Sequence, residues 1–196
     1  GRDVRKYMAW CGKFLVVFIV VWGIFSYLPY KDAVKYQELK TGVYEKSAWL
    51  YHRAAIDEDP VDVAFFGTSH TLLAIDDILI QSDLTTELAT QVNVANYSIP
   101  QYGRDMHYHL LKLLLTYKKP KLIYIEVRES EARDLHPGMS YLAEPEELLS
   151  APLIVNLRFF ENLLSLPARN LGLLLKSYLP ELFPSTEFNS QAQASH

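Results

Sequence analysis

The residues best suited to chemistry surround Ser69, in the segment VDVAFFGTSHT at positions 61–71. Its first six residues predict a mostly buried β-strand, and Gly67 supplies the permissive backbone that a sharp exit from a sheet requires. Ser69 then stands at the carboxyl end of a strand, where loops and helix amino termini bring unpaired N–H groups to one crevice. A serine held there is a candidate nucleophile for acyl chemistry. The alternative is that Ser69 caps the following helix, because hydroxyls satisfy free N–H groups at helix starts.

A nucleophilic serine needs a base within hydrogen-bond reach, ~2.6 to 3.2 Å. His70 is adjacent to Ser69, and adjacent side chains on an extended turn diverge, so we predict that His70 is a crevice wall or substrate contact. His136 follows the third predicted strand on a loop, with Asp134 nearby to orient it, and is the predicted substitute base. The alternative is that His136 caps a turn before Pro137.

Polar residues also follow the other two predicted strands. Asn96 and Ser98 lie in the loop after the second strand, where Asn96 is predicted to place an amide in the crevice. A dense charged run at positions 126–134 follows the third strand, at the same predicted sheet edge as Ser69. Arg128 or Arg133 in this run is predicted to clamp an anionic group of a polymer through its planar fork. The alternative is a solvated loop with internal ion pairs.

The strands that must position these residues are predicted at 61–66, 92–95 and 122–127. Helical spacing of apolar residues predicts a helix at 75–89, with Asp76 or Asp77 as its amino-terminal cap, and another at 103–117. Two strand-helix-strand units in a row favour a parallel sheet with right-handed crossovers. The predicted fold class is therefore α/β, a short parallel sheet with flanking helices, preceded by one transmembrane helix.

The transmembrane prediction rests on residues 14–28, FLVVFIVVWGIFSYL, which together with 8–12 approach the ~20 residues that a spanning helix needs. Basic residues precede this segment and aromatic residues gather at its far end, so the positive-inside rule predicts a cytoplasmic amino terminus and an extracytoplasmic domain. A cleaved signal peptide is the rival, but residues 25–27 do not form a small-x-small cleavage site.

The remaining boundaries follow from composition. We predict a cytoplasmic tip and membrane anchor at 1–30, a juxtamembrane stalk helix at 31–59 and an α/β core at 60–150. A helical tail is predicted at 151–196, in two pieces separated near Pro167 and with a disordered end.

Composition excludes several classes of function. The net charge of −4 and the pI of about 5.9 argue against a nucleic-acid partner. Cys11 is the only cysteine, and His107 and His109 are two residues apart on a predicted helix, whereas a metal pair needs a spacing of three or four. No phosphate-cradling glycine loop occurs, so neither a metal nor another cofactor is predicted.

Taken together, a strand followed by Gly67, Thr68 and Ser69, a strand ending at Asn96, and a third strand reached through an amphipathic helix resemble the start of an SGNH/GDSL-type hydrolase domain. The variant that the chain most resembles is the membrane-anchored kind that works on cell-envelope polymers. This kind includes the acyl-transfer proteins that partner membrane-bound O-acyltransferases. The resemblance covers residues 61–127.

The resemblance implies a flavodoxin-like three-layer fold in which Ser69 is the nucleophile. It also implies an oxyanion hole made by the N–H of Ser69 and that of residue 97 or 98. The implied activity is ester hydrolysis or acyl transfer on an envelope polysaccharide or polymer, without a cofactor.

Three features depart from the family's pattern. Thr68 replaces the usual aspartate, no glycine precedes Gly103 in the loop after the second strand, and no Asp-x-x-His motif supplies the family's base. Either that motif lies beyond this sequence, or catalysis is absent. The second hypothesis is therefore a non-catalytic, membrane-tethered binding or assembly module with a degenerate SGNH-like fold. A third is that the anchor helix pairs with a polytopic membrane partner.

Overall fold

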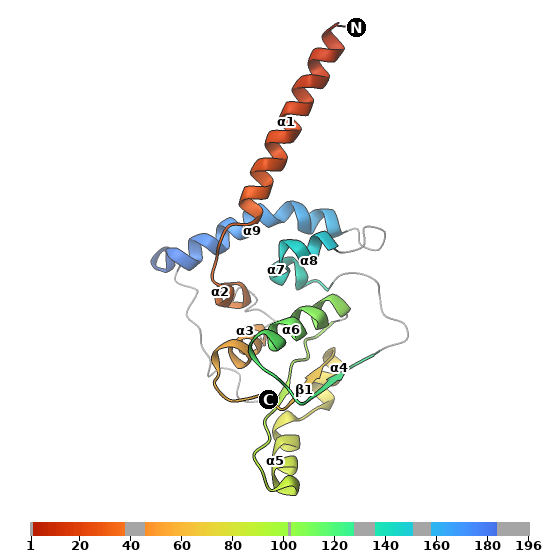
Figure 1. Ribbon diagram of the computed structural model, residues 1–196, viewed down its shortest axis with the longest axis vertical. Coiled ribbons are helices and arrows are strands. Elements are labelled where there is room, and N and C mark those ends of the chain that lie inside the picture. The colour runs from red at the N-terminus through yellow and green to blue at the C-terminus, as the bar shows by residue number, and fades with distance from the viewer. Residues whose placement is uncertain (1, 38–45, 102, 128–135, 151–157, 184–196) are drawn as a thin grey trace.

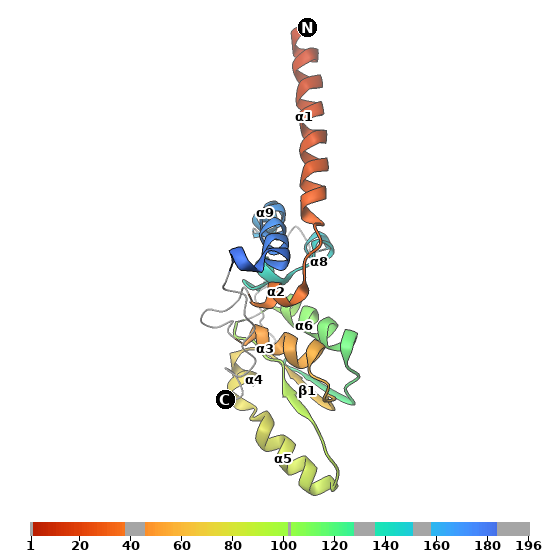
Figure 2. The same cartoon turned by 90° about the vertical axis from the view of Figure 1, so that its left-hand side faces the viewer.

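The computed structural model describes residues 2–37, 46–101, 103–127, 136–150 and 158–183. Over these ranges the chain is mostly helical, with one small sheet. The long helix α1 (Arg2–Ser26) projects away from all other elements, as the two side views show (Figures 1 and 2). The helix is long and apolar enough to cross a membrane, and its most apolar stretch has a mean hydropathy of 2.1 and is not buried inside the protein.

The sheet has three parallel strands in the order β2-β1-β3. The strands are β1 (Val63–Phe66), β2 (Val94–Asn96) and β3 (Leu122–Ile125). Helices α4 (Ser69–Ala74) and α5 (Asp77–Leu88) connect β1 to β2, and α6 (Arg104–Tyr117) connects β2 to β3. The predicted short parallel sheet is therefore present, and the structure is compatible with the predicted α/β class. Asp76 caps α5 as predicted, accepting a hydrogen bond of 2.9 Å from the N–H of Leu79.

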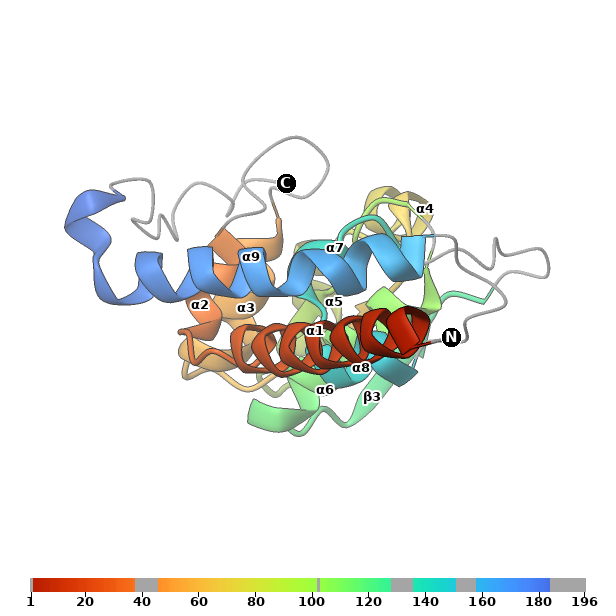
Figure 3. The same ribbon diagram turned by 90° about the horizontal axis from the view of Figure 1, so that it is seen from above.

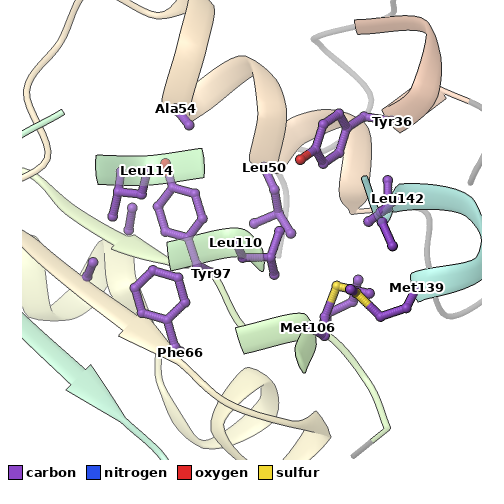
Figure 4. Close-up of a cluster of buried hydrophobic side chains, with 14 of the residues drawn as sticks. Tyr36, Leu50, Ala54, Phe66, Tyr97, Met106, Leu110, Leu114, Met139 and Leu142 are labelled. Carbon is purple, nitrogen blue, oxygen red and sulfur yellow. The ribbon is translucent and has the colours of Figure 1, made fainter. Parts of the chain in front are cut away.

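Helices lie on both faces of the sheet. On one face, buried Phe66 and Tyr97 stack with ring centroids 5.4 Å apart, beneath Leu110 and Leu114 of α6 (Figure 4). On the other face, a smaller cluster of Val63, Val92 and Val94 packs against α5. The alternation of side chains along β1 therefore supplies both layers, as the period of two residues in a strand requires.

The segment at 31–59, predicted as a stalk helix that packs onto the domain, contains several short helical elements in its described residues. These are α2 (Asp32–Gln37), α3 (Ser47–Tyr51) and a π-helical turn, η2 (His52–Ile56). Leu50 and Ala54 from this segment are buried in the same core as Phe66 (Figure 4). The segment therefore packs against the sheet as part of the folded domain.

The carboxyl-terminal part adds α7 (Met139–Leu142), α8 (Pro145–Ser150), α9 (Arg158–Tyr178) and a 3-10 turn, η4 (Pro180–Leu182). Helix α9 runs crosswise at the carboxyl-terminal end of α1, which we call the foot of α1 (Figures 1 and 2), and the two helices are in contact. The predicted break at Pro167 is wrong, because α9 continues through it. The disorder predicted at the end of the tail falls at 184–196, outside the described residues.

The continuity of α9 has a structural cause. Proline lacks an N–H, so Pro167 cannot bond to the carbonyl of Leu163, four residues earlier. The indole N–H of Trp22 in α1 donates to that carbonyl instead, at 3.1 Å. A side chain from another helix thus replaces the missing backbone donor, and α1 and α9 are joined at the point where α9 would otherwise be weakest.

Candidate functional site

The turn after β1 separates the helix cap from the candidate nucleophile. The amino-terminal cap of α4 is Thr68, whose hydroxyl accepts from the N–H of His70 at 3.3 Å. Ser69 is the first residue of α4, and its side chain is half-buried. Within the described residues, the Ser69 hydroxyl makes no hydrogen bond. Capping, the alternative role considered for Ser69, is therefore carried out by its neighbour, and the hydroxyl of Ser69 has no structural task in this turn.

Glu126, directly after β3, holds this turn in place. Its carboxylate accepts hydrogen bonds from the N–H of Thr68 at 2.8 Å, from the Thr68 hydroxyl at 3.0 Å and from the Thr71 hydroxyl at 2.6 Å. Burial raises the pKa of Glu126, but the hydrogen bonds from Thr71 and Thr68 outweigh it and hold this pKa below the usual 4.5. The carboxylate is thus ionised at neutral pH, where it links the ends of two neighbouring strands.

Gly67 permits this close approach. A Cβ at position 67 would lie 2.1 Å from Oγ1 of Thr71 and 2.6 Å from Oε2 of Glu126, distances that no real side chain tolerates. The glycine after β1 is therefore required because other atoms fill the space beside it. In the sequence motif Gly-Thr-Ser, the glycine leaves room for neighbouring atoms, the threonine caps α4, and the serine is half-buried with a hydroxyl that makes no hydrogen bond within the described residues.

His70 lies beside the turn, and its role as a crevice wall or substrate contact stays a prediction. Its side chain is exposed, and its Nδ1 lies 3.3 Å from the hydroxyl of Thr68. The imidazole thus contacts the capping residue. Its positive form would also favour the ionised state of Glu126.

The loop after β2 is adjacent to the turn, since the N–H of Ile99 donates to the carbonyl of Gly67 at 3.0 Å. It does not supply the groups that were predicted. The side-chain amide of Asn96 donates to the carbonyl of Thr71 in α4 and to that of Ile75 directly after α4, and its oxygen accepts from the N–H of Ser98. Asn96 is therefore a buried brace between β2 and α4, and its amide is not available to a substrate.

The second oxyanion donor predicted at residue 97 or 98 is also engaged. The N–H of Tyr97 donates to the carbonyl of Phe65 at 2.7 Å, which continues the parallel ladder beyond β2. The N–H of Ser98 is held by Asn96 at 3.1 Å. Ser98 itself is fully buried. Of the predicted pair, only the N–H of Ser69 remains, at a helix position that has no intrahelical acceptor.

His136 does not have the geometry of a general base. Its ring is only 1% exposed; its Nε2 donates to the carbonyl of Pro100 at 2.8 Å and its Nδ1 accepts from the N–H of Gly138 at 3.0 Å. Burial lowers the pKa of this imidazole below 6.5, so the ring is neutral at pH 7. Both nitrogens bond to the backbone, and His136 is better described as a buried turn histidine, which was the alternative considered for it.

Close packing explains why Gly103 precedes α6. A Cβ at position 103 would lie 2.4 Å from the Cβ of His136. The side chain of Asp105 accepts from the N–H of His136 at 2.9 Å, which fixes the backbone of the same residue. His136 also lines an open pocket of about 300 Å³, together with Pro137, Ser140, Glu161 and Asn162. Ser69 is not among these lining residues.

A second polar cluster lies between α2, α6 and α8 and was not found from the sequence. Nδ1 of His109 lies 2.8 Å from Glu147, and Nε2 of His109 lies 2.8 Å from the hydroxyl of Tyr36. Burial raises the pKa of Glu147, but the hydrogen bond and charge of His109, with a further hydrogen bond from Lys112, lower it to about 2. Buried Lys35 pairs with Glu144 in the same cluster.

This cluster was missed because nothing in the sequence predicts that α2, α6 and α8 converge. His109 was considered only as a metal ligand, whereas it is buried and paired with Glu147. The cluster joins helices to one another and has no contact with Ser69 in the described residues. We assign it to stability.

Arg128 and the rest of the charged run at 128–134 lie outside the described residues. Within the described residues, no group of three or more His, Cys, Asp and Glu side chains has a geometry that could hold a metal ion. No protein-family model, curated protein or solved structure matches the chain.

Proposed function

We propose that the chain is a membrane-anchored SGNH-like esterase or O-acyltransferase that acts on acyl groups of cell-envelope polymers through Ser69. The observation that carries this proposal is that, in the turn after β1, other residues cap the helix and hold the backbone, which leaves the hydroxyl of Ser69 unbonded in the part of the chain that the structure describes. Thr68 caps α4, Glu126 and Gly67 fix the backbone, and the hydroxyl of Ser69 is half-buried and unbonded within the described residues. A hydroxyl held rigidly at the carboxyl end of the central strand of a parallel sheet is where such folds place reacting groups.

In the proposed reaction, the Ser69 oxygen attacks the acyl carbonyl while a base removes its proton. The carbonyl oxygen gains negative charge, which the N–H of Ser69 at the start of α4 stabilises. The ester C–O bond then breaks, and the alcohol leaves with the proton that the base returns to it. The resulting acyl-enzyme passes its acyl group to water in hydrolysis, or to a polymer hydroxyl in transfer, and the Ser69 hydroxyl is restored. The reaction requires a base other than His136, because both ring nitrogens of His136 bond to the backbone.

The experiment is labelling of the full-length protein with a fluorophosphonate, which forms a covalent bond with activated serines. Wild type should be labelled and Ser69→Ala should not. Ser98→Ala is the matched control, because Ser98 is fully buried in the adjacent loop and should leave labelling unchanged. Absence of labelling in a folded wild-type protein, or loss of labelling in Ser98→Ala with retention in Ser69→Ala, would refute the assignment.

A second candidate function is a non-catalytic, membrane-tethered binding module. It is favoured by the bonding of Asn96 and His136, whose polar side-chain atoms are all taken up by the protein itself. This candidate predicts no phosphonate labelling, together with retention of the protein on isolated envelope polymer that Ser69→Ala does not weaken. The enzyme hypothesis predicts the opposite labelling result, so one probe separates the two.

The same proposal places α1 across the cytoplasmic membrane, with the amino terminus inside and the sheet outside. The length and hydropathy of α1 and its separation from the rest of the fold support a membrane span. The basic residues before the apolar segment and the aromatic residues at its far end support the orientation. A membrane-impermeant thiol reagent tests it: Cys11 near the amino terminus should be protected in intact cells, and a cysteine introduced at Ser82 on α5 should react.

A further inference from the structure

Helix α9 carries an exposed apolar stripe that the fold does not cover. Its members recur at spacings of three, four or seven residues, and therefore lie on one side of a helix. They include Phe160, 61% exposed, Leu164, 59% exposed, and Tyr178, 59% exposed. Leu171 and Leu175 continue the row, and Leu182 in η4 extends it. We call these residues the outer stripe.

A different face of α9 holds the protein together. Asn162, Leu166, Asn170, Leu173 and Ser177 are buried and also recur in steps of three or four. The amide of Asn170 donates to the carbonyl of Ser26 at the end of α1, and the hydroxyl of Ser177 accepts from the N–H of Lys31 at 3.0 Å. The packing of α9 on the domain is therefore already satisfied, and the outer stripe is additional apolar surface.

The position of α9 identifies what covers that surface. Helix α9 lies against the foot of α1 and runs crosswise to it, on the side of the domain from which α1 projects (Figures 1 and 2). Viewed from above, α9 and the foot of α1 lie side by side over the other elements (Figure 3). If α1 spans the bilayer, α9 lies at the level where α1 leaves it, parallel to the membrane surface.

Aromatic residues are placed as an interfacial helix requires. Trp22 bonds to α9 near the end of α1, and exposed Tyr27 follows that helix directly. Tyr178 lies at the end of α9, with the ammonium group of Lys31 5.9 Å from its ring centre. Tyrosine and tryptophan concentrate at membrane-water interfaces because their rings are amphipathic.

We propose that α9 is an in-plane membrane helix whose outer stripe inserts into the outer leaflet beside α1, so that the domain is attached to the bilayer at two points. This proposal rests on α1 spanning the membrane and does not depend on the chemistry of Ser69. Amphipathic helices of this kind bury their apolar face at the boundary between headgroups and acyl chains.

The test uses the full chain with Cys11 replaced by alanine, reconstituted into vesicles of phosphatidylcholine and phosphatidylglycerol. A single cysteine carrying an environment-sensitive fluorophore is introduced at Leu164 or at Ser165, which are adjacent and therefore point in different directions from the helix. Spin-labelled lipids with a shallow quencher should remove most of the emission from Leu164→Cys and little from Ser165→Cys. Leu171→Cys is a second stripe position and should behave as Leu164→Cys does.

A label at Phe18→Cys, midway along α1, separates failure of the anchor from failure of the stripe. Deep quenching at Phe18 with equal, weak quenching at Leu164 and Ser165 would overturn the proposal while leaving the anchor intact, and would mean that solvent or protein covers α9. Absence of quenching at Phe18 would remove the anchor, and the in-plane helix with it.

Discussion

The bond between Trp22 and the Leu163 carbonyl predicts an energetic coupling between two helices that are far apart in the sequence. Trp22→Phe removes the indole N–H and leaves that carbonyl without a donor, because Pro167 has none to offer. An unsatisfied, partly buried carbonyl costs about 1–3 kcal/mol in the free energy of unfolding. Pro167→Ala restores a backbone N–H four residues after Leu163, so Trp22→Phe should cost about 1 kcal/mol less in that background.

The assay is denaturant unfolding of four full-length proteins in the same detergent, followed by circular dichroism: wild type, each single variant and the double variant. Trp10→Phe is the control, because Trp10 is exposed near the other end of α1 and should change nothing. An equal cost of Trp22→Phe in the wild-type and Pro167→Ala backgrounds, within the ~0.3–0.5 kcal/mol scatter of independent sites, would refute the reasoning.

Three further changes test the turn and the second polar cluster. Gly67→Ala should destabilise the protein strongly, since its Cβ would lie 2.1 Å from Oγ1 of Thr71, whereas Gly172→Ala has open space and should not; equal melting temperatures would contradict this. Glu126→Gln should cost about 1–3 kcal/mol of unfolding free energy, because an amide cannot accept all the hydrogen bonds that the carboxylate holds, and an unchanged urea midpoint would show that the bonds contribute nothing. Glu147 has a folded pKa of about 2, below the usual 4.5, so its contribution is complete above pH 4.5 and is lost as the pH falls toward 2. The stability difference between wild type and Glu147→Gln should accordingly shrink over that window, and a pH-independent difference would count against the assignment.

The sheet could be predicted from the sequence because its signals are local. Apolar runs ending in turn residues located all three strands, and the spacing of Met106, Leu110 and Leu114 located α6. Asp76 was one of two predicted caps, and it forms the bond that a cap requires. Each of these features depends on residues within one turn or one strand of each other.

The misses are all long-range. Pro167 predicts a break in a helix unless a donor arrives from elsewhere, and Trp22 is 141 residues away from the carbonyl that it reaches. The amide of Asn96 was predicted to reach a substrate because its actual partners, the carbonyls of Thr71 and Ile75, lie more than 20 residues earlier in the chain. Ser69 lies just after β1, as the sequence predicts. That Thr68 rather than Ser69 caps α4 could be seen only from the geometry of Thr68 and Glu126.

The attachment of α9 to the carboxyl-terminal end of α1 fixes the distance between the domain and the end of the anchor helix. The domain begins to pack directly at the end of α1, because the side-chain amide of Asn170 donates to the carbonyl of Ser26, the last residue of α1. With α1 in a bilayer, the height of Ser69 above the lipid would be set by the thickness of the folded layers, and thermal swinging of the domain would change it little. Under the proposed function, only the part of a polymer chain that passes at that height could reach Ser69. The distance from the membrane, and not only the local chemical structure, would then select the position that is modified.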